Sequence, residues 1–186
     1  MAEFRHETER LVLRDWRDAD WAEFFRVTNT PAVMRWLGGV LDEAGKEATR
    51  ARVESCAASN GFCFWAIERK DDAALLGFCG LKRANAPGST VIDKMEVGWR
   101  LREDAWGKGC AKEAASAAID AGFDRFHADE IVALTVIDNE ASRGLMKRLG
   151  MRRRAELDYP DARYDPPWRD TIVYSIDRPA WEKQRG

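Results

Sequence analysis

Histidine and cysteine are scarce in this 186-residue chain, and their spacing suits no metal site. The two histidines, His6 and His127, cannot form a multi-histidine cluster. No cysteine pair has the C-x-x-C spacing of a zinc or redox site, and three of the four fall in segments typical of a protein core. We therefore predict no metal cofactor and free, mostly buried thiols. The cysteines are Cys56, Cys63, Cys79 and Cys110.

Long apolar runs and an excess of one charge are also missing. No apolar run approaches the ~18 residues that suggest a membrane span. The first ten residues, MAEFRHETER, lack the apolar centre of a signal peptide. The 30 basic and 32 acidic residues give a net charge of −2 without a basic stripe. These features predict a cytoplasmic protein with no membrane or nucleic-acid partner.

What the chain does contain is enough apolar material for one folded domain. Hydrophobic residues make up 45% and charged residues 33%, which is ordinary for a globular protein. The length suits one domain, and no internal repeat or low-complexity linker divides it. We predict a single domain over residues 1–186.

Apolar periodicity predicts both helices and strands. The three central strands are joined by short turns, at 71–72 and 86–88, so they should form an antiparallel meander. The order predicts an α/β (α+β) fold with a single mixed, mostly antiparallel sheet flanked by helices. Strands are expected at 9–14, 62–69, 74–83, 94–102, 130–136, 151–157 and 170–176. Helices are expected from Asp18, at 32–37, at 42–58, after residue 109, and after Asn139.

Two glycines one residue apart stand between a predicted strand and a helix with an alanine-rich face. Gly107 and Gly109 permit a tight turn and a close approach of a ligand to the backbone. The first turn of a helix has free amide donors and a partial positive charge. Residues 107–112 can therefore bind a pyrophosphate, with Lys108 and Lys112 adding charge. A glycine pair alone can equally be a simple turn.

Two other phosphate-binding motifs fit this loop less well. The G-x-x-x-x-G-K-[ST] loop is absent. A dinucleotide-binding loop requires a third glycine at position 112, which is lysine, and it follows the first strand of a parallel unit. Asp138, at the end of the next strand, does suit a ribose-binding acid. A dinucleotide-binding enzyme therefore remains an alternative.

The segment EVGWRLREDAWGKGCAKEA (96–114) resembles the acyl-CoA-binding segment of the GNAT superfamily of N-acetyltransferases. It is similar in particular to the branch that acetylates ribosomal-protein N-termini. The family pattern is [QR]-x-x-G-x-[GA]. Here Trp106 takes the first position, as is usual in that branch, and Gly109 and Ala111 take the small positions.

Two further segments carry the same resemblance. TERLVLRDWRDAD (8–20) is similar to the first strand of the branch and the entry to its first helix. NEASRGLMKRLGMR (139–152) is similar to its asparagine-to-serine helix and the glycine turn that follows. The similarity runs from about residue 7 to 177, and it implies the GNAT fold.

The resemblance implies acetyl-CoA as co-substrate and assigns the residues that hold it. The backbone of Trp99–Leu101 would pair with the pantetheine arm, and one amide there would support the thioester oxygen. The amides of 107–112 would hold the pyrophosphate, and Asn139 and Ser142 would contact the lower arm and the sulfur. The predicted cofactor-binding residues are Trp99, Arg100, Leu101, Trp106, Gly107, Lys108, Gly109, Cys110, Ala111, Lys112, Asn139 and Ser142.

Acetyl transfer to an amine needs a base, because an amine attacks a thioester only when it is neutral. Glu96, just before the CoA-binding backbone, is the candidate base, acting through a water. The alternative is a structural glutamate paired with Arg100 or another cation. Asp93, at the start of the strand, is a weaker candidate base.

The departing thiolate needs a proton donor. Many relatives have a tyrosine four residues before the glycine that ends the helix after Asn139. In this chain that glycine is Gly150, and the tyrosine position is Met146. Ser142, which the resemblance places at the same cleft, is the candidate donor. The alternative is a serine that only satisfies the first turn of its helix.

The acceptor should enter on the face opposite the cofactor, between the early helices and the last loop. Aromatic side chains there would line the site, and four acids would attract a cation. The predicted substrate contacts are Trp36, Tyr159 and Trp168, with Trp21 and Tyr164 as further candidates. The acids are Asp158, Asp161, Asp165 and Asp170.

These observations predict an N-acetyltransferase that moves an acetyl group from acetyl-CoA to a primary amine. The acceptor would be a small-molecule amine or a protein or peptide N-terminus, with the α-amine of a protein or peptide favoured. A non-catalytic acyl-CoA sensor on the same fold is the alternative that Met146 supports. We expect a monomer or a homodimer.

Overall fold

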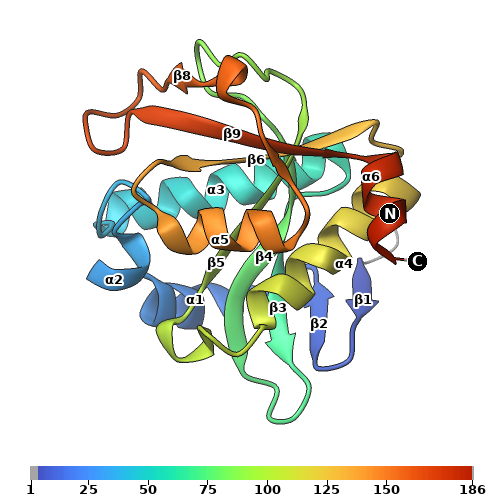
Figure 1. Cartoon of the computed structure of the whole chain (residues 1–186). Coiled ribbons are helices and arrows are strands. Elements are labelled where there is room, and N and C mark those ends of the chain that lie inside the picture. The colour runs from blue at the N-terminus through green and yellow to red at the C-terminus, as the bar shows by residue number, and fades with distance from the viewer. Residues whose placement is uncertain (1–3, 186) are drawn as a thin grey trace.

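The computed structural model describes residues 4–185, in which strands and helices succeed one another along the chain (Figure 1). The strands are β1 (Arg5–Glu7), β2 (Leu11–Arg14), β3 (Phe64–Arg69), β4 (Leu75–Arg83), β5 (Met95–Leu101), β6 (Glu130–Val136), β7 (Arg152–Arg153), β8 (Tyr159–Pro160) and β9 (Asp170–Asp177). The α-helices are α1 (Asp20–Thr28), α2 (Pro31–Met34), α3 (Glu43–Asn60), α4 (Cys110–Asp124), α5 (Glu140–Arg148) and α6 (Arg178–Arg185).

The strands of residues 4–185 form a single nine-stranded sheet. Its order is β1-β2-β3-β4-β5-β6-β9-β7, and β8 pairs with β9 beside this path. Every neighbouring pair is antiparallel except β5 and β6. The predicted fold class and the central meander are therefore confirmed. Residues 1–3 and 186 of the predicted domain lie outside the described residues.

Helix α4 packs closely on one face of the sheet because its buried side is built from small residues. Ala114, Ala115 and Ala118 are fully buried against the strands. At Gly122 a Cβ would lie only 2.6 Å from Cδ1 of Ile131 in β6. The alanine-rich pattern therefore brings the helix axis close to the sheet, and α5 packs in the same cluster (Figure 1).

An aromatic cluster covers the opposite face, beneath α1 and α3. Trp21 and Phe24 of α1 pack with Phe78 of β4 and Val53 of α3. The Phe24 and Phe78 rings stack with centroids 5.5 Å apart. Among the helices of residues 4–185, none combines the length and the apolar character that a membrane span requires.

The region after α5 differs from its prediction. The sequence pattern predicts a strand over 151–157, but only Arg152 and Arg153 pair with β9. The Asp158 carboxylate accepts a hydrogen bond from the Val173 amide at 3.1 Å, so a side chain takes the place of the next strand residue. The chain can then turn through a 3-10 helix over 155–157.

Three elements were not predicted, and one was shorter than predicted. Strand β1 is exposed along its whole length, so it has no alternation of apolar and polar residues. Helix α6 buries only Trp181, so it has no apolar stripe. Strand β8 has two residues. Helix α2 ends at Met34 instead of residue 37, because the chain enters a turn that leads to Gly38 and Gly39.

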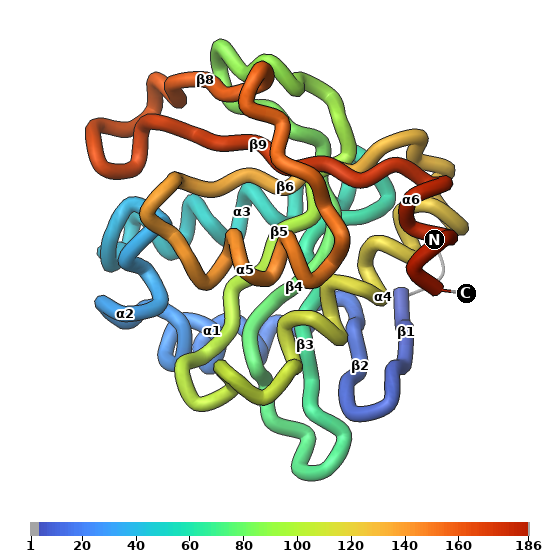
Figure 2. Tube along the Cα trace, viewed as in Figure 1, coloured from blue at the N-terminus to red at the C-terminus, as the bar shows by residue number. Residues whose placement is uncertain are grey.

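Strands β5 and β6 are paired over two residues and then separate. Met95 lies beside Ile131 and Glu96 beside Val132, but no pair follows. Figure 2 shows the two chain segments starting together and moving apart. The edge of β5 that faces β6 therefore has no partner strand over 97–101. Its other edge remains paired with β4 through Leu101.

Gly77 lets the backbone of β4 approach the backbone of β5 closely. Its φ is +138°, and an added Cβ would lie 2.0 Å from the carbonyl oxygen of Arg100 in β5. The register of β3 against β4 shifts beside it, between Ile67 and Glu68. The glycine therefore permits both the close approach of the two backbones and the bulge.

We expect Gly77→Ala to lower the free energy of unfolding by on the order of 3 kcal/mol, because the backbone of β5 cannot move away from the new Cβ without breaking the sheet. Gly88→Ala is the matched control. Gly88 also has a positive φ, +79°, but no atom lies within 4 Å of an added Cβ. The control should cost only about 1 kcal/mol. Urea denaturation measures both, and equal losses would contradict the close-packing argument.

Candidate functional site

A cavity of about 610 Å³ lies over the end of the sheet where β5 and β6 separate. Its walls come from β5, the segment after α2, the start of α5 and the loop over 159–171. These parts are up to about 130 residues apart in the chain, so only the fold brings them together. The predicted residues that line the cavity are Trp36, Asp93, Glu96, Trp99, Arg100, Asn139, Ser142, Tyr159 and Trp168.

The loop after β8 is held over this cavity by the segment after α2. The Trp168 indole N–H donates to the Arg35 carbonyl at 2.8 Å. The Tyr164 ring lies 3.2 Å from the position of a Cβ on Gly38. Tyr159 is buried, whereas Trp36 and Trp168 are half-buried and present part of their rings to solvent.

Glu96 lies at the cavity and is paired with a cation from the neighbouring strand. Lys82 of β4 is its register partner, and Lys82 Nζ lies 2.7 Å from Glu96 Oε2. The two atoms are close enough for an ion pair, but their geometry is not that of a hydrogen bond. Glu96 Oε2 is therefore buried without a hydrogen-bond donor among the described residues. The structural alternative is a pair with Arg100 or another cation of the sheet, and the structure shows the latter, with Lys82 as the partner. Asp93 lines the same cavity but is exposed.

Asn139 begins α5 and orients its first turn. Its Oδ1 accepts from the Ser142 amide at 3.3 Å, and its Nδ2 donates to Thr135 Oγ1 at 3.0 Å. Asn139 is therefore the N-cap of α5, and the predicted start of this helix after Asn139 is confirmed. Ser142 uses its amide for this cap, and no hydrogen bond involves its hydroxyl within residues 4–185. Met146 follows one helical turn later and lines the same cavity.

The loop before α4 has the geometry expected of an anion site. Gly107 and Gly109 both have positive φ, +70° and +81°. In the described part of the chain, the amides of residues 107–112 donate to no backbone carbonyl. Lys108 and Lys112 are exposed, so the turn combines free donors with positive charge. This loop lies outside the cavity lining, at the far end of the gap beside β5.

The remaining predicted loop residues have structural contacts. The Trp106 indole N–H donates to the Leu101 carbonyl at 2.9 Å, although half of the ring surface is exposed. Cys110 is buried in the main apolar cluster, which supports a packing role for its thiol. Ala111 packs against the same cluster.

A brace from the turn between β1 and β2, which the sequence did not reveal, holds the loop in place. Arg10 Nε donates to Glu113 Oε2 at 2.7 Å, and Arg10 Nη1 donates to the Lys108 carbonyl at 2.9 Å. Glu113 also accepts from the Thr8 hydroxyl at 2.6 Å. Burial raises the pKa of Glu113, but the hydrogen bonds from Thr8 and Arg10 outweigh it and lower the pKa overall. The contacts span about 100 residues, so no local pattern indicates them.

Three of the four acids predicted to attract a cation are occupied by arginines. Asp161 is chelated by Arg163 at 2.6 Å and is itself buried. The Asp158 and Asp170 carboxylates pair in the same way with Arg153 and Arg169. An acidic surface for a cationic acceptor is therefore wrong for these three residues, because a nearby arginine neutralises each of them.

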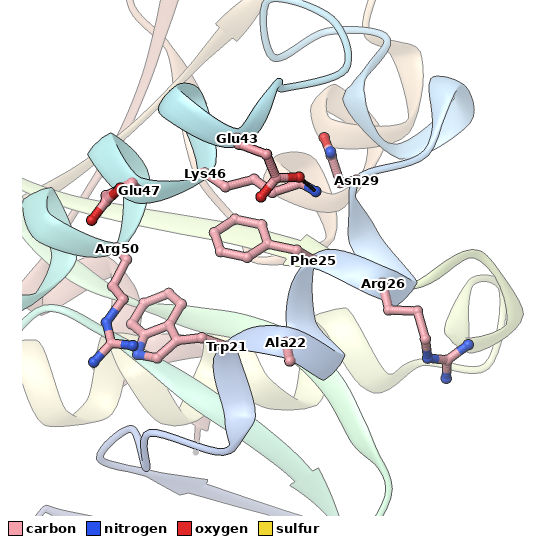
Figure 3. Close-up of a pocket in the computed structure, with 9 residues that line it drawn as sticks. All are labelled: Trp21, Ala22, Phe25, Arg26, Asn29, Glu43, Lys46, Glu47 and Arg50. Atoms are coloured by element: carbon pink, nitrogen blue, oxygen red, sulfur yellow. Dashed lines mark hydrogen bonds and ion pairs between the residues drawn. The ribbon is translucent and has the colours of Figure 1, made fainter.

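A second, more open depression lies between α1 and α3 (Figure 3). Trp21 and Phe25 form its floor, and Lys46 pairs with Glu43 at its edge. Of the predicted catalytic, cofactor-binding and substrate residues, this depression contains only Trp21, one of the further substrate candidates. We therefore assign the site to the cavity beside β5.

Comparison with known proteins identifies one family for most of the chain. Residues 10–152 match the family described as the acetyltransferase (GNAT) domain. The uncharacterized protein YkkB of Bacillus subtilis (strain 168) is 33% identical over 148 residues, which cover 77% of this chain and 83% of YkkB. The uncharacterized N-acetyltransferase YoaA of the same strain is 29% identical over 176 residues, which cover 93% of this chain and 96% of YoaA.

Solved structures share the fold at lower identity. An acetyltransferase from Agrobacterium tumefaciens str. C58 superposes with a TM-score of 0.78 at 21% identity, covering 96% of both chains. The ribosomal-protein-S5-alanine acetyltransferase from Vibrio fischeri has a TM-score of 0.73 at 19% identity, covering 96% of this chain and 98% of that one. At this identity the likeness extends to the fold alone.

The loop geometry predicts that the two lysines beside the free amides contribute to binding of coenzyme A. We expect Lys108→Ala/Lys112→Ala to weaken binding about three- to tenfold at low salt, with a smaller effect at high salt because exposed charges are screened. Lys183→Ala, which removes an exposed lysine of α6, is the control. Isothermal titration at two salt concentrations measures the effect. Unchanged affinity at low salt would remove these lysines from the site.

Proposed function

We infer that this chain, which belongs to the GNAT family of acetyltransferases, transfers an acetyl group from acetyl-CoA to a primary amine by direct attack. The observation that carries this inference is the separation of β5 from β6 after Glu96. It provides an unpaired strand edge that leads from the cavity toward the loop before α4. An extended thioester co-substrate fits such a gap, with its phosphates at one end and its acyl group at the other.

The unpaired edge of β5 is the proposed partner of the pantetheine arm. Backbone groups of an open strand edge are ready to pair with another extended chain, and the amide groups of pantetheine can supply that pairing. The backbone of Trp99–Leu101 would place the thioester beside the cavity. An amide there would stabilise the negative charge that develops on the carbonyl oxygen during attack.

The pyrophosphate is assigned to the amides of residues 107–112. These donors have no backbone acceptor, and they lie at the start of a 15-residue helix whose dipole favours an anion. The brace from Arg10 to Glu113 and to the Lys108 carbonyl would keep the donors in position before the ligand arrives. The fit therefore rests on donor geometry and positive charge together.

Glu96 is the proposed base. Its carboxylate is largely buried at the cavity, next to the strand edge where the thioester would lie. A water between Glu96 and the ammonium of the acceptor would carry the proton away, and the neutral amine would attack the carbonyl carbon. The Lys82 pair orients the carboxylate within the site.

Ser142 is the proposed proton donor to the departing thiolate. Its hydroxyl makes no hydrogen bond within residues 4–185, and it faces the cavity one turn before Met146. Because the thioether of Met146 has no proton to give, the hydroxyl of Ser142 is the donor available on this face of α5. Asn139 would position both the helix turn and the lower arm of the co-substrate.

The acceptor would reach the thioester from beneath Trp36, Tyr159 and Trp168. The resemblance to the ribosomal-protein branch supports an α-amine of a protein or peptide. The excess of positive charge in the cavity supports a different acceptor, a small amine that carries an anionic group.

We expect Glu96→Gln to lower kcat/KM about 100-fold or more at neutral pH, because the amide keeps the shape of the side chain but accepts no proton. The loss should shrink at high pH, where the amine is already neutral. Glu130→Gln is the matched control, since Glu130 is also half-buried and paired with Lys94, but outside the cavity. A pH–rate profile of thiol release measures both. Wild-type kcat/KM at every pH in Glu96→Gln would show that another group is the base.

For Ser142→Ala we expect an about 100-fold lower kcat with little change in Tm, because the cap bond uses the backbone amide. Adding Met146→Tyr to Ser142→Ala should restore part of the rate, because the tyrosine supplies a hydroxyl from the next turn of α5. Ser116→Ala, in α4, is the control. Stopped-flow thiol release and thermal denaturation provide the two readouts. An unchanged kcat in Ser142→Ala would exclude Ser142 from proton transfer.

A further inference from the structure

Arg100 is a buried cation without a partner. It is 7% exposed, and its guanidinium lies over the Phe24 and Phe78 rings at 5.2 and 5.3 Å. Its Nε and Nη1 are enclosed and have no hydrogen-bond acceptor in the described residues, which leaves Nη2 as the nitrogen from which a ligand can approach. The side chain lines the cavity.

Arg14 shows how this protein accommodates a buried arginine that serves only the fold. Arg14 is 3% exposed, and it pairs with Asp20 at 2.7 Å and with Glu68 at 3.0 Å. Arg100 has neither kind of partner within residues 4–185. A buried charge is stabilised by an opposite charge or by hydrogen bonds, and aromatic faces compensate only in part. Arg100 therefore lacks the partner that Arg14 has.

The side chains that line the cavity carry an excess of positive charge. Its acids Glu96 and Asp161 are each occupied by a cation. Arg52, Arg83 and Arg100 have no ion pair within the described residues, and Asp93 is the single unpaired acid opposite them. Burial lowers the pKa of Arg100 to about 10, and the charge of Arg52 adds to this effect. Arg100 therefore remains charged at neutral pH, in a cavity that favours an anion.

We propose that Arg100 binds a carboxylate on the acceptor, so that the substrate is a small amine that also carries a carboxylate group. This proposal rests on the acetyl transfer inferred above and narrows its acceptor. The accessible Nη2 of the guanidinium can donate a charge-assisted hydrogen bond to a carboxylate, and the strength of this bond increases when water is excluded. The open Nη2 donor of Arg100 and the unbalanced charge around it are the features that such an acceptor would satisfy.

The register of β5 puts the proposed carboxylate site and the proposed base on the same face. Glu96 and Arg100 are four residues apart on one strand, so their Cα atoms lie about 13 Å apart. Gly98 stands between them, and the Phe64 ring occupies the space that a Cβ there would fill, 2.9 Å away. The floor between the two charges is therefore aromatic. An acceptor with its amine toward Glu96 and its carboxylate toward Arg100 would lie along this floor.

The test compares amines that differ only in the carboxylate. Thiol release from acetyl-CoA is measured for a panel of α-amino acids, their α-amides and the corresponding decarboxylated amines. We expect the preferred amino acid to exceed its amide by about 100-fold in kcat/KM. The amide has more neutral amine at pH 7, so this preference cannot arise from the reactivity of the amine.

Arg100→Met supplies the matched variant, because methionine fits among aromatic rings without a charge. It should reduce the preference for the acid over the amide to less than threefold, mainly through KM of the acid. The readout is the ratio of kcat/KM for acid and amide, so any effect of the substitution on binding of acetyl-CoA by the β5 backbone cancels. Its Tm without ligand should equal or exceed that of the wild type, since an unpaired buried charge is removed. Arg14→Met should instead lower Tm, because it leaves Asp20 and Glu68 without their cation.

Two outcomes separate this proposal from the one it rests on. Equal turnover of acids, amides and amines, or a preference for peptides over free amino acids, would overturn the carboxylate site while acetyl transfer stands. Absence of thiol release from every amine would overturn the acetyl transfer. In that case the carboxylate site is tested by the effect of amino acids on Tm of the protein saturated with coenzyme A. Amino acids should raise Tm of the wild type and not of Arg100→Met, and no rise would overturn the carboxylate site as well.

Discussion

Backbone amide and carbonyl groups within a sheet must pair or remain accessible to a ligand or to water. The site depends on the place where β5 and β6 stop satisfying this requirement for each other. They pair at Met95 and Glu96 only, while β5 remains fully paired with β4. Gly77 permits the close contact with β5 on the paired side. The open edge is thus held in a rigid sheet, which keeps it extended and available to an extended thioester.

The elements around this edge place the other parts of the reaction. Helix α4 lies close to the sheet because its buried side is made of alanine, and its first turn therefore starts beside the end of β5. Helix α5 begins at Asn139, which sets the direction of its first turn. In the proposed site, the two helix starts would provide donors for the phosphates at one end of the gap and a hydroxyl at the other. Each helix is fixed by apolar packing, while its polar terminus remains free for the ligand.

The two faces of β5 have different tasks because side chains alternate along a strand. Trp99 packs toward α4, in the main apolar cluster, whereas Arg100 points to the aromatic cluster under α1. In the proposed arrangement, one strand would separate the co-substrate from the acceptor, and residues one position apart would contact different ligands. The contrast between Arg14 and Arg100 supports this division, because a buried arginine that had only to support the fold would have carboxylate partners.

The sequence by itself determined the central meander, the glycine loop before an alanine-faced helix, and the cap at Asn139, because each depends on contacts between residues near in sequence. It also indicated the family through three separate motifs. Only the tertiary structure decided which charges meet. Lys82 reaches Glu96 across a strand pair, and Arg10 reaches Glu113 over about 100 residues. Arg100 has no carboxylate or hydrogen-bond partner in the part of the chain that the structure describes. Charge pairing depends on distances between side chains from different elements, and those distances exist only once the sheet has formed.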